Sequence, residues 1–284
     1  MLAVLSALSV PQDLAFHVAI ALLVSAVGFL RVVYFVSLGY AGSVAAMALL
    51  LLLRMGSPSR EALTLHCALL LLYGLRLGSY LALRERQPAY RREIPEIAER
   101  SAGISLTKRI GIWLGVSLLY VLMFSPALFQ AWVAAASGPS TPGSTGLGRL
   151  PTWLGLLVMV TGLGLESLAD AQKSAAKKLQ PTRFCDQGLY RFVRCPNYLG
   201  EILFWIGNFL AGLSAYHALW QWAAAATGLV CIVLIMLGST KRLEAKQAER
   251  YGKDPEYQRY ITTVPVLFPW VPVYSLQGVR VYLE

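Results

Sequence analysis

Residues 32–53 read VVYFVSLGYAGSVAAMALLLLL, a run without a charged side chain. Such a run is long enough for a membrane helix, which needs about 20 mostly apolar residues to cross the hydrocarbon core of a bilayer. The rest of the chain has the same character, because 56% of its 284 residues are hydrophobic and 14% are charged, whereas soluble domains carry roughly 25% charged residues. This composition excludes an ordinary soluble enzyme, a disordered chain and a disulfide scaffold. It predicts an all-α, polytopic membrane protein.

Seven segments have the length and composition of membrane spans. We expect them at 14–30, 32–53, 62–83, 110–136, 152–170, 197–216 and 218–238. The first residues, through Asp13, contain no basic residue and do not resemble a signal peptide. No segment between the spans is as large as a soluble domain. We therefore expect one multi-pass integral membrane domain over 1–284, surrounded by membrane lipids.

The positive charges lie mainly on one side of these spans. Successive spans place the connecting segments alternately on the two sides of the membrane. Of the 25 Lys and Arg residues, 21 fall on one side, chiefly in 84–109, 171–196 and the tail after 238. Because basic loops stay on the cytoplasmic side, we expect the N-terminus outside and the C-terminus in the cytoplasm. No basic segment is interleaved with aromatic residues, so nucleic acid is not an expected partner. The cysteine and histidine spacing indicates no metal site.

Polar residues in the third span form a candidate functional surface. His66, Tyr73, Arg76 and Tyr80 lie within about 80° of one another on a helical wheel. Charged groups inside a membrane are costly and usually face a cavity or a partner. The alternative for Arg76, about two turns from the end of the span, is that its guanidinium extends to the interface.

The end of the fifth span carries a second polar stripe. Glu166, Asp170, Lys173 and Lys177 follow one another at spacings of four, three and four, which keep them on one helical face. Exposed pairs at i,i+4 would explain such a pattern at a helix end. Glu166, however, lies within the apolar run 163–168, so it requires a partner or a polar pocket in the membrane.

Residues 188–201, GLYRFVRCPNYLGE, contain the most unusual combination of residue types. Pro196 is typical of the first turn of a helix, so the sixth helix is predicted to begin there. Arg191 and Arg194 precede this start, and arginines beside helix N-terminal amides form an anion site suited to the phosphates of a nucleotide. The alternative is a pair of ordinary interfacial arginines.

The sixth span then presents a polar face to the membrane. Asn197, Glu201 and Asn208 lie on this face, and Glu201 is followed directly by Ile-Leu-Phe-Trp. A second intramembrane acid supports a binding site, although a polar network that satisfies itself is again the alternative. The basic and aromatic tail over 241–270 is either an interfacial belt or a lid over the nucleotide.

The segment 188–201 resembles the C-terminal signature of the membrane steroid 5-alpha-reductase family. It is most similar to the bacterial-type branch of obscure function, whose core usually reads Arg-His-Pro-Asn-Tyr-x-Gly-(Glu/Asp). The corresponding core here is RCPNYLGE, from Arg194 to Glu201. Further segments resembling this branch are 166–173 (ESLADAQK), 73–78 (YGLRLG) and the tail from Leu243 to Trp270. We therefore divide the chain into less family-like helices over 1–60, a reductase-like core over 61–270 and a C-terminal tail over 271–284.

The resemblance implies a seven-helix fold that binds NADPH and reduces the carbon–carbon double bond of an enone in a steroid or another lipid within the bilayer. Tyr73 matches the family's catalytic tyrosine, which hydrogen-bonds the carbonyl of the substrate, and a hydroxyl of pKa about 10 can fill this role. The expected cofactor-binding residues are Arg76, Glu166, Asp170, Lys173, Lys177, Arg191, Arg194, Asn197, Tyr198, Glu201 and Glu244.

Two departures from the family pattern keep other functions open. Cys195 stands where the signature has His, and the second span lacks the acid that the family carries there; its polar residues include Ser37 and Tyr40. Both departures favour a non-catalytic subunit that keeps the fold and assembles with other membrane subunits. A membrane methyltransferase of the isoprenylcysteine type, which has a similar Arg-His-Pro-x-Tyr turn and binds S-adenosylmethionine, is the third hypothesis. The segments 73–76 and 166–173 favour the reductase.

Overall fold

The computed structural model describes residues 10–54, 61–86, 103–136 and 150–279, and these residues form helices and connecting turns without a strand. Seven helical segments are long and apolar enough to cross a membrane, which confirms the predicted all-α, seven-span membrane fold. The spans are Val10–Phe29, Val32–Arg54, Glu61–Glu85, Leu106–Ala136, Leu150–Leu179, Pro196–Ala215 and Leu219–Tyr251. The sixth helix begins at Pro196 as predicted.

Two helices continue beyond their predicted membrane spans. Helix α8 (Leu150–Leu179) extends past the predicted span 152–170 through Lys173 and Lys177, as the polar stripe on one helical face predicts, and α10 (Leu219–Tyr251) extends past the predicted span 218–238. The prediction stopped where charged residues begin, because such residues leave the hydrocarbon core. Ala, Glu, Gln, Lys and Arg dominate both extensions, and these residues are strong helix formers in water. The helices therefore extend past the membrane, and the first part of the predicted tail belongs to α10.

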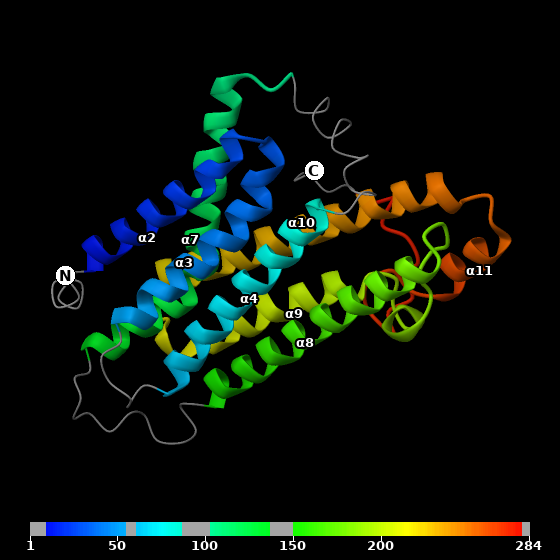
Figure 1. Ribbon diagram of the computed structural model, residues 1–284. Coiled ribbons are helices and arrows are strands. Elements are labelled where there is room, and N and C mark those ends of the chain that lie inside the picture. Colours follow the sequence, from blue (N-terminus) through cyan, green and yellow to red (C-terminus); the bar gives the residue numbers. More distant parts are fainter. Residues whose placement is uncertain (1–9, 55–60, 87–102, 137–149, 280–284) are drawn as a thin grey trace. The chain divides into compact units, whose positions relative to one another are not determined.

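The chain forms two compact units, which are described separately. Unit 1 comprises residues 1–153 and 209–228, and unit 2 comprises residues 154–208 and 229–284. Unit 1 contains α2 (Val10–Ser25), α3 (Leu38–Arg54), α4 (Glu61–Glu85) and α7 (Leu106–Ala136), with two short 3₁₀ turns between α2 and α3 (Figure 1). Unit 2 contains most of α8, most of α9 (Pro196–Ala211), the larger part of α10 from Leu229 onward, and α11 (Pro255–Thr263).

In unit 1, α3 packs along α4 through small residues. A Cβ atom added to Gly74 would lie 2.5 Å from the carbonyl oxygen of Ala41 and 2.8 Å from the Cβ of Ala45. Membrane helices associate mainly through such close packing, since lipid is as apolar as a leucine side chain. At the other end of α3, the carboxylate of Asp13 accepts hydrogen bonds from Arg54 and, at 2.7 Å, from the indole of Trp132. These contacts connect α2 and α7 to α3.

In unit 2, α8 and α9 approach each other at glycines on both helices. A Cβ on Gly162 would lie 2.5 Å from the backbone nitrogen of Phe204, and one on Gly200 would lie 2.6 Å from the backbone nitrogen of Glu166. Gly207 meets the backbone of Met159 in the same way, at 2.6 Å. The two helices therefore run side by side in near backbone contact (Figure 1).

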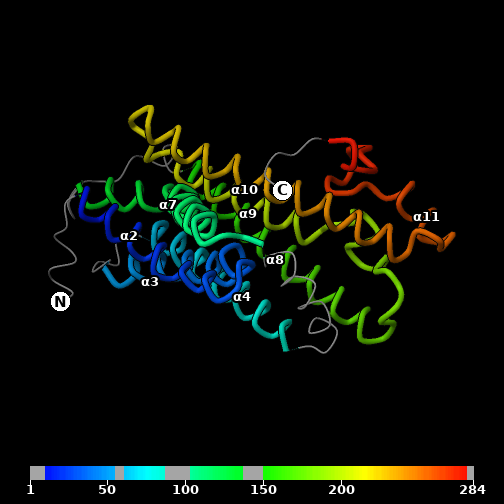
Figure 2. Tube along the Cα trace, turned by 90° about the horizontal axis from the view of Figure 1, so that it is seen from above, coloured from blue at the N-terminus to red at the C-terminus, as the bar shows by residue number. Residues whose placement is uncertain are grey.

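The C-terminal part of unit 2 is anchored by an aromatic cluster and a segment that follows α11. Phe184, Tyr251 and Tyr257 are buried together, and Asp254 caps α11 by accepting a hydrogen bond of 2.8 Å from the backbone of Glu256. Residues 264–279, called the C-terminal strap below, then return along α10, where Gln277 donates to the carbonyl of Lys241 at 2.9 Å. Figure 2 shows the strap beside the second half of α10.

Candidate functional site

Tyr73, the predicted catalytic residue, is fully buried on α4 and shares a hydrogen bond with a second tyrosine. Its hydroxyl lies 2.8 Å from that of Tyr40 on α3, and either can be the donor. The two rings meet edge to face, with centroids 6.0 Å apart. This pairing depends on the neighbouring residue Gly74, because a side chain there would push the two helices apart. A pair of membrane-buried hydroxyls is an uncharged hydrogen-bonding group suited to a carbonyl.

The other members of the polar stripe on α4 face different partners. The ring of His66 lies 2.9 Å from the side-chain oxygen of Gln130 on α7. The guanidinium of Arg76 lies over the ring of Tyr80, 5.6 Å from its centroid. Tyr73 and His66 therefore contact neighbouring helices, whereas Arg76 and Tyr80 contact each other.

Polar residues predicted on α8 and α9 are buried along the line where the two helices touch in unit 2. Glu166 and Asp170 on α8 are buried, as are Glu201 and Asn208 on α9. The backbone of Glu166 lies against Gly200, so the two membrane acids belong to neighbouring turns of touching helices. This clustering follows from the glycines, since only a close approach of the two backbones brings these turns together.

The loop between α8 and α9 is held by side chains from α8. Gly188 has a φ of 61°, a left-handed conformation that favours glycine, and a side chain there would collide with Gln172. The side-chain oxygen of Gln172 accepts a hydrogen bond of 2.8 Å from the backbone of Leu189. Lys177 donates to the carbonyl of Arg183 and, at 2.7 Å, to the hydroxyl of Tyr251. Lys177 thus organises the loop in addition to its predicted role at the cofactor.

Arg194 forms a buried ion pair with Glu244 of α10. One of its terminal nitrogens lies 2.7 Å from the carboxylate and also donates to the carbonyl of Tyr274 in the C-terminal strap. The second carboxylate oxygen of Glu244 accepts a hydrogen bond of 2.9 Å from the backbone of Leu276. The pair therefore connects the start of α9 to both α10 and the strap.

Arg194 nevertheless keeps one unused donor. Among the residues that the structure describes, its Nε atom is buried and has no hydrogen-bond partner. Leaving a buried polar group unsatisfied is costly, so this N–H is a site at which an acceptor would be favoured.

Cys195 is packed in the same polar region. Burial raises the pKa of its thiol to about 12, while the nearby charges of Lys173 and Arg194 act in the opposite direction. The backbone of Cys195 donates to the carbonyl of Val266 in the strap at 3.1 Å. Lys173 and Arg194 thus both lie close enough to Cys195 to influence its thiol.

This packing predicts that Cys195 resists alkylation in the folded protein. With a pKa of about 12, only about one thiol in ten thousand is ionised near pH 8, and the thiolate is the reactive form. Cys185, whose pKa burial also raises, is half-buried and should react first with N-ethylmaleimide. Peptide mass spectrometry measures both rates, with protein unfolded in dodecyl sulfate as the control. Equal rates in the folded protein would contradict the packing.

The remaining predicted residues have different exposures. Arg191 is exposed, and Asn197 and Tyr198 are half-buried in the first turn of α9. Ten of the predicted cofactor residues, Glu166, Asp170, Lys173, Lys177, Arg191, Arg194, Asn197, Tyr198, Glu201 and Glu244, belong to unit 2, whereas Tyr73 and Arg76 belong to unit 1.

Sequence reasoning missed three contributors to these contacts. Tyr40 was noted only as a polar residue of a span without an acid, Gln172 only as part of a similar segment, and Tyr274 was placed outside the reductase-like core. A tyrosine next to small residues in one span, opposite Tyr73-Gly74 in the next, was the available signal for Tyr40. Nothing in the sequence marks the backbone carbonyl of Tyr274 as a partner of Arg194.

The chain is similar to one protein family and to one fungal protein. The model of a family described as "Protein of unknown function (DUF1295)" matches residues 26–264. The chain is also similar to an uncharacterized protein of Schizosaccharomyces pombe, with 30% identity over 137 residues, which are 41% of this chain and 38% of that protein. The match thus spans less than half of that relative. No solved structure matches the chain significantly.

Proposed function

The chain belongs to the DUF1295 family, and we propose that its activity is the NADPH-dependent reduction of a carbon–carbon double bond in a steroid-like or other lipid enone. The observation that supports this proposal best is the buried hydroxyl pair of Tyr40 and Tyr73, 2.8 Å apart. Reduction of an enone places negative charge on the carbonyl oxygen, and a preorganised donor in a water-poor site stabilises that charge.

In this proposal the two hydroxyls act in sequence. Tyr73 donates its hydrogen bond to the carbonyl oxygen of the lipid, and Tyr40 donates to the oxygen of Tyr73. The second bond offsets the charge that Tyr73 takes on as its proton moves toward the substrate, because linked hydrogen bonds strengthen one another. Tyr40 thereby takes the place of the acid that this span lacks.

The residues of unit 2 fit the cofactor that this reaction requires. The buried, unpartnered Nε of Arg194 and the ammonium of Lys173 are donors suited to a phosphate group. Carboxylates such as those of Asp170 and Glu201 accept hydrogen bonds from hydroxyl and amide groups. NADPH, when bound, supplies the hydride. The membrane-buried acids would orient its polar groups, and apolar helix surfaces would exclude water.

The experiment that tests this proposal measures ligand binding and turnover separately. NADPH should raise the melting temperature of the purified protein, whereas S-adenosylmethionine should not. The reverse result would favour the methyltransferase, and no response to either ligand, with no copurifying nucleotide, would argue against both enzymes.

Tyr73→Phe should lower turnover of an enone by about 10²–10³-fold, the usual effect of removing one donor to a developing oxyanion, while NADPH still raises the melting temperature. Tyr80→Phe is the matched control on the same helix, because it removes one hydroxyl and keeps the ring that lies under Arg76. It should leave turnover unchanged. If Tyr73→Phe also left turnover unchanged, Tyr73 would have no place in the mechanism.

A specific observation favours one other function, a non-catalytic membrane subunit. Arg194 and Glu244, both expected at the cofactor, bind each other and the strap. Such contacts are expected if these residues stabilise the fold instead of binding a cofactor. Native mass spectrometry of gently solubilised membranes distinguishes the two functions. Stoichiometric partner subunits without bound nucleotide would support the subunit, and a nucleotide-bound monomer would support the reductase.

A further inference from the structure

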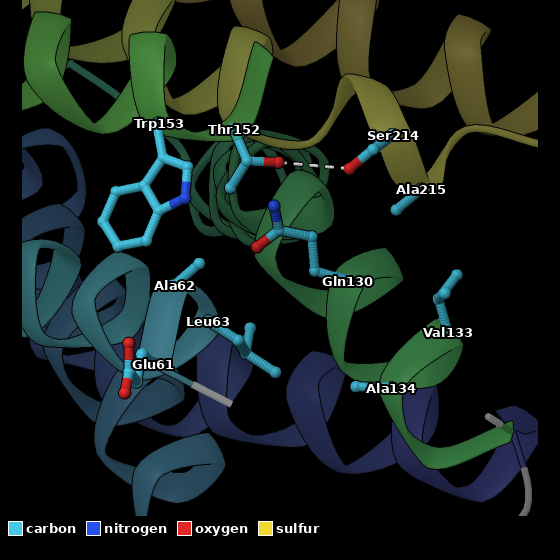
Figure 3. Close-up of a pocket in the computed structure, with 10 residues that line it drawn as sticks. All are labelled: Glu61, Ala62, Leu63, Gln130, Val133, Ala134, Thr152, Trp153, Ser214 and Ala215. Atoms are coloured by element: carbon cyan, nitrogen blue, oxygen red, sulfur yellow. Dashed lines mark hydrogen bonds between the residues drawn. The ribbon is translucent and has the colours of Figure 1, made fainter. Parts of the chain in front are cut away.

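A cavity of about 340 Å³ opens in unit 1, away from the hydroxyl pair (Figure 3). It is lined by the first turn of α4, the end of α7, the first turn of α8 and the short turn after α9. Leu63 at this cavity precedes Tyr73 by ten residues, or about 15 Å along the helix. The cavity thus lies at one end of the spans, opposite the end at which α4 leads into the basic segment 84–109.

The inner part of the cavity carries polar groups held in fixed positions. The side-chain oxygen of Gln130 lies 2.9 Å from the ring nitrogen of buried His66, and its amide nitrogen donates to the carbonyl of Ala211. The hydroxyl of Thr152 donates to the same carbonyl at 3.1 Å and lies 3.1 Å from the hydroxyl of Ser214 (Figure 3). A primary amide has two N–H groups and two acceptor positions, so Gln130 retains hydrogen-bonding capacity toward the cavity.

The walls of the cavity are apolar and end at an aromatic ring. Leu63 and Val133 form part of the wall, and the indole of Trp153 lies at the side of the cavity (Figure 3). Trp153 is 44% exposed. Tryptophan at a span end is typical of the membrane–water interface, where one part of the ring is apolar and the other polar. This arrangement suits a molecule with a polar head and an apolar chain.

The charge of the lining restricts the head group. Glu61 contributes a carboxylate, and the described residues that line the cavity include no lysine, arginine or histidine. A negatively charged head would meet an acid without a compensating cation. The volume lies near the lower end of the range for small-molecule sites, about 300–1,000 Å³, so it accommodates a head group and the start of a chain.

We propose that this cavity binds the head of a single-chain amphiphile that carries a hydroxyl or amino group and no negative charge. The polar groups around Gln130 hold the head, Glu61 favours an ammonium, and the chain leaves past Trp153 into the lipid. This site is separate from the proposed reduction and does not depend on it.

Photolabelling of the full chain in lipid nanodiscs tests the proposal. The probes are a long-chain amine with a diazirine on its chain, the matching alcohol and the matching carboxylic acid. The amine and the alcohol should label peptides that contain residues 61–63, 130–134 or 152–153, and the acid should label them at least about fivefold less. Equal labelling by the acid would overturn the proposal.

Variants that fill the cavity provide a second test of the proposed binding site. Ala134→Trp places a large side chain in the lining and should reduce labelling by the amine and the alcohol at least about fivefold, whereas Ala135→Trp, at the exposed neighbouring residue outside the lining, should not. Unchanged labelling of a folded Ala134→Trp variant would overturn the proposal. If that variant does not fold, exposed Glu61→Gln serves instead. It should reduce labelling by the amine to the level of the alcohol, and no reduction would overturn the proposal.

Discussion

Arg194→Met should lower the free energy of unfolding by about 3–5 kcal/mol, the usual cost of breaking a buried ion pair from one side. The substitution leaves Glu244 as a buried carboxylate that keeps its hydrogen bond from the backbone N–H of Leu276 but has lost the arginine. It also removes the hydrogen bond to the carbonyl of Tyr274. The C-terminal strap should therefore loosen. Thermal unfolding in detergent and limited proteolysis after residue 264 measure the two effects.

A double variant distinguishes the ion pair from other roles of Arg194. Arg194→Met combined with Glu244→Leu should recover most of the lost stability, since replacing both partners by apolar residues is often close to neutral. Arg191→Met, at an exposed arginine three residues earlier, should change stability by no more than about 0.5 kcal/mol. If the single and double variants were equally unstable, the pair would not be the source of the effect.

The same double variant also tests the proposed cofactor site. The folded double variant lacks Arg194 and Glu244, both expected at the cofactor, and should no longer gain thermal stability from NADPH. If instead it responds to NADPH like the unmodified protein, Arg194 serves the strap alone. Measuring stability and NADPH response on one variant keeps the structural role of Arg194 separate from its binding role.

Gly200→Ala should be similarly damaging, although it adds a single methyl group. The new Cβ would lie 2.6 Å from the backbone nitrogen of Glu166 and 2.7 Å from the carbonyl oxygen of Gly162. Backbone atoms of a helix cannot rotate away as a side chain can, so α8 and α9 must separate. We expect a loss of about 3 kcal/mol or more, at or beyond the upper end of typical overpacking effects, measured by thermal unfolding.

Gly164→Ala is the matched control for this experiment. Gly164 lies on α8, two residues from Gly162, but a Cβ there meets no atom within 4 Å. Alanine at this position should therefore stabilise the helix by about 0.5–1 kcal/mol through its better helix propensity. Equal losses from Gly200→Ala and Gly164→Ala would mean that glycine content, rather than the close approach of the two helices, determines stability here.

The expected separation of α8 and α9 also has a functional consequence. Glu166 and Glu201 are brought near each other because Gly162 and Gly200 allow the backbones to touch. If the proposed cofactor site includes both acids, Gly200→Ala should weaken the response to NADPH more than its effect on stability explains. Gly200 thus positions Glu166 and Glu201 by letting the two helices approach each other.

Much of the fold could be predicted because its determinants are local. The run 32–53 and six similar runs are each long enough to span a membrane, and a bilayer requires helices whose backbone groups are satisfied internally. Pro196 marked the start of α9 for the same kind of reason, since its ring suits the first turn of a helix. The continuation of α10 into the predicted tail was missed because helix propensity continues beyond the limit that hydrophobicity sets.

The candidate site was less accessible to sequence reasoning because its contacts join distant residues. The sequence identified Tyr73, Glu166, Arg194 and Glu201 as costly or unusual groups in or beside a membrane. It contained no information on which of them would meet, and it showed no acid in the second span. In the structure the hydroxyl of Tyr73 meets that of Tyr40 in this span, thirty-three residues earlier.

The sequence by itself determined that this protein crosses a membrane seven times as helices, because the hydrophobic effect and internal hydrogen bonding act along each span separately. Only the tertiary structure decided which polar groups became partners. Tyr40 meets Tyr73 because Gly74 lets α3 approach α4, and Glu166 lies against α9 because Gly200 has no side chain. Arg194 pairs with Glu244 because the strap and α10 converge on the start of α9. Packing between helices depends on how the surfaces of the two helices fit together at each contact. The composition of a single span does not specify that fit.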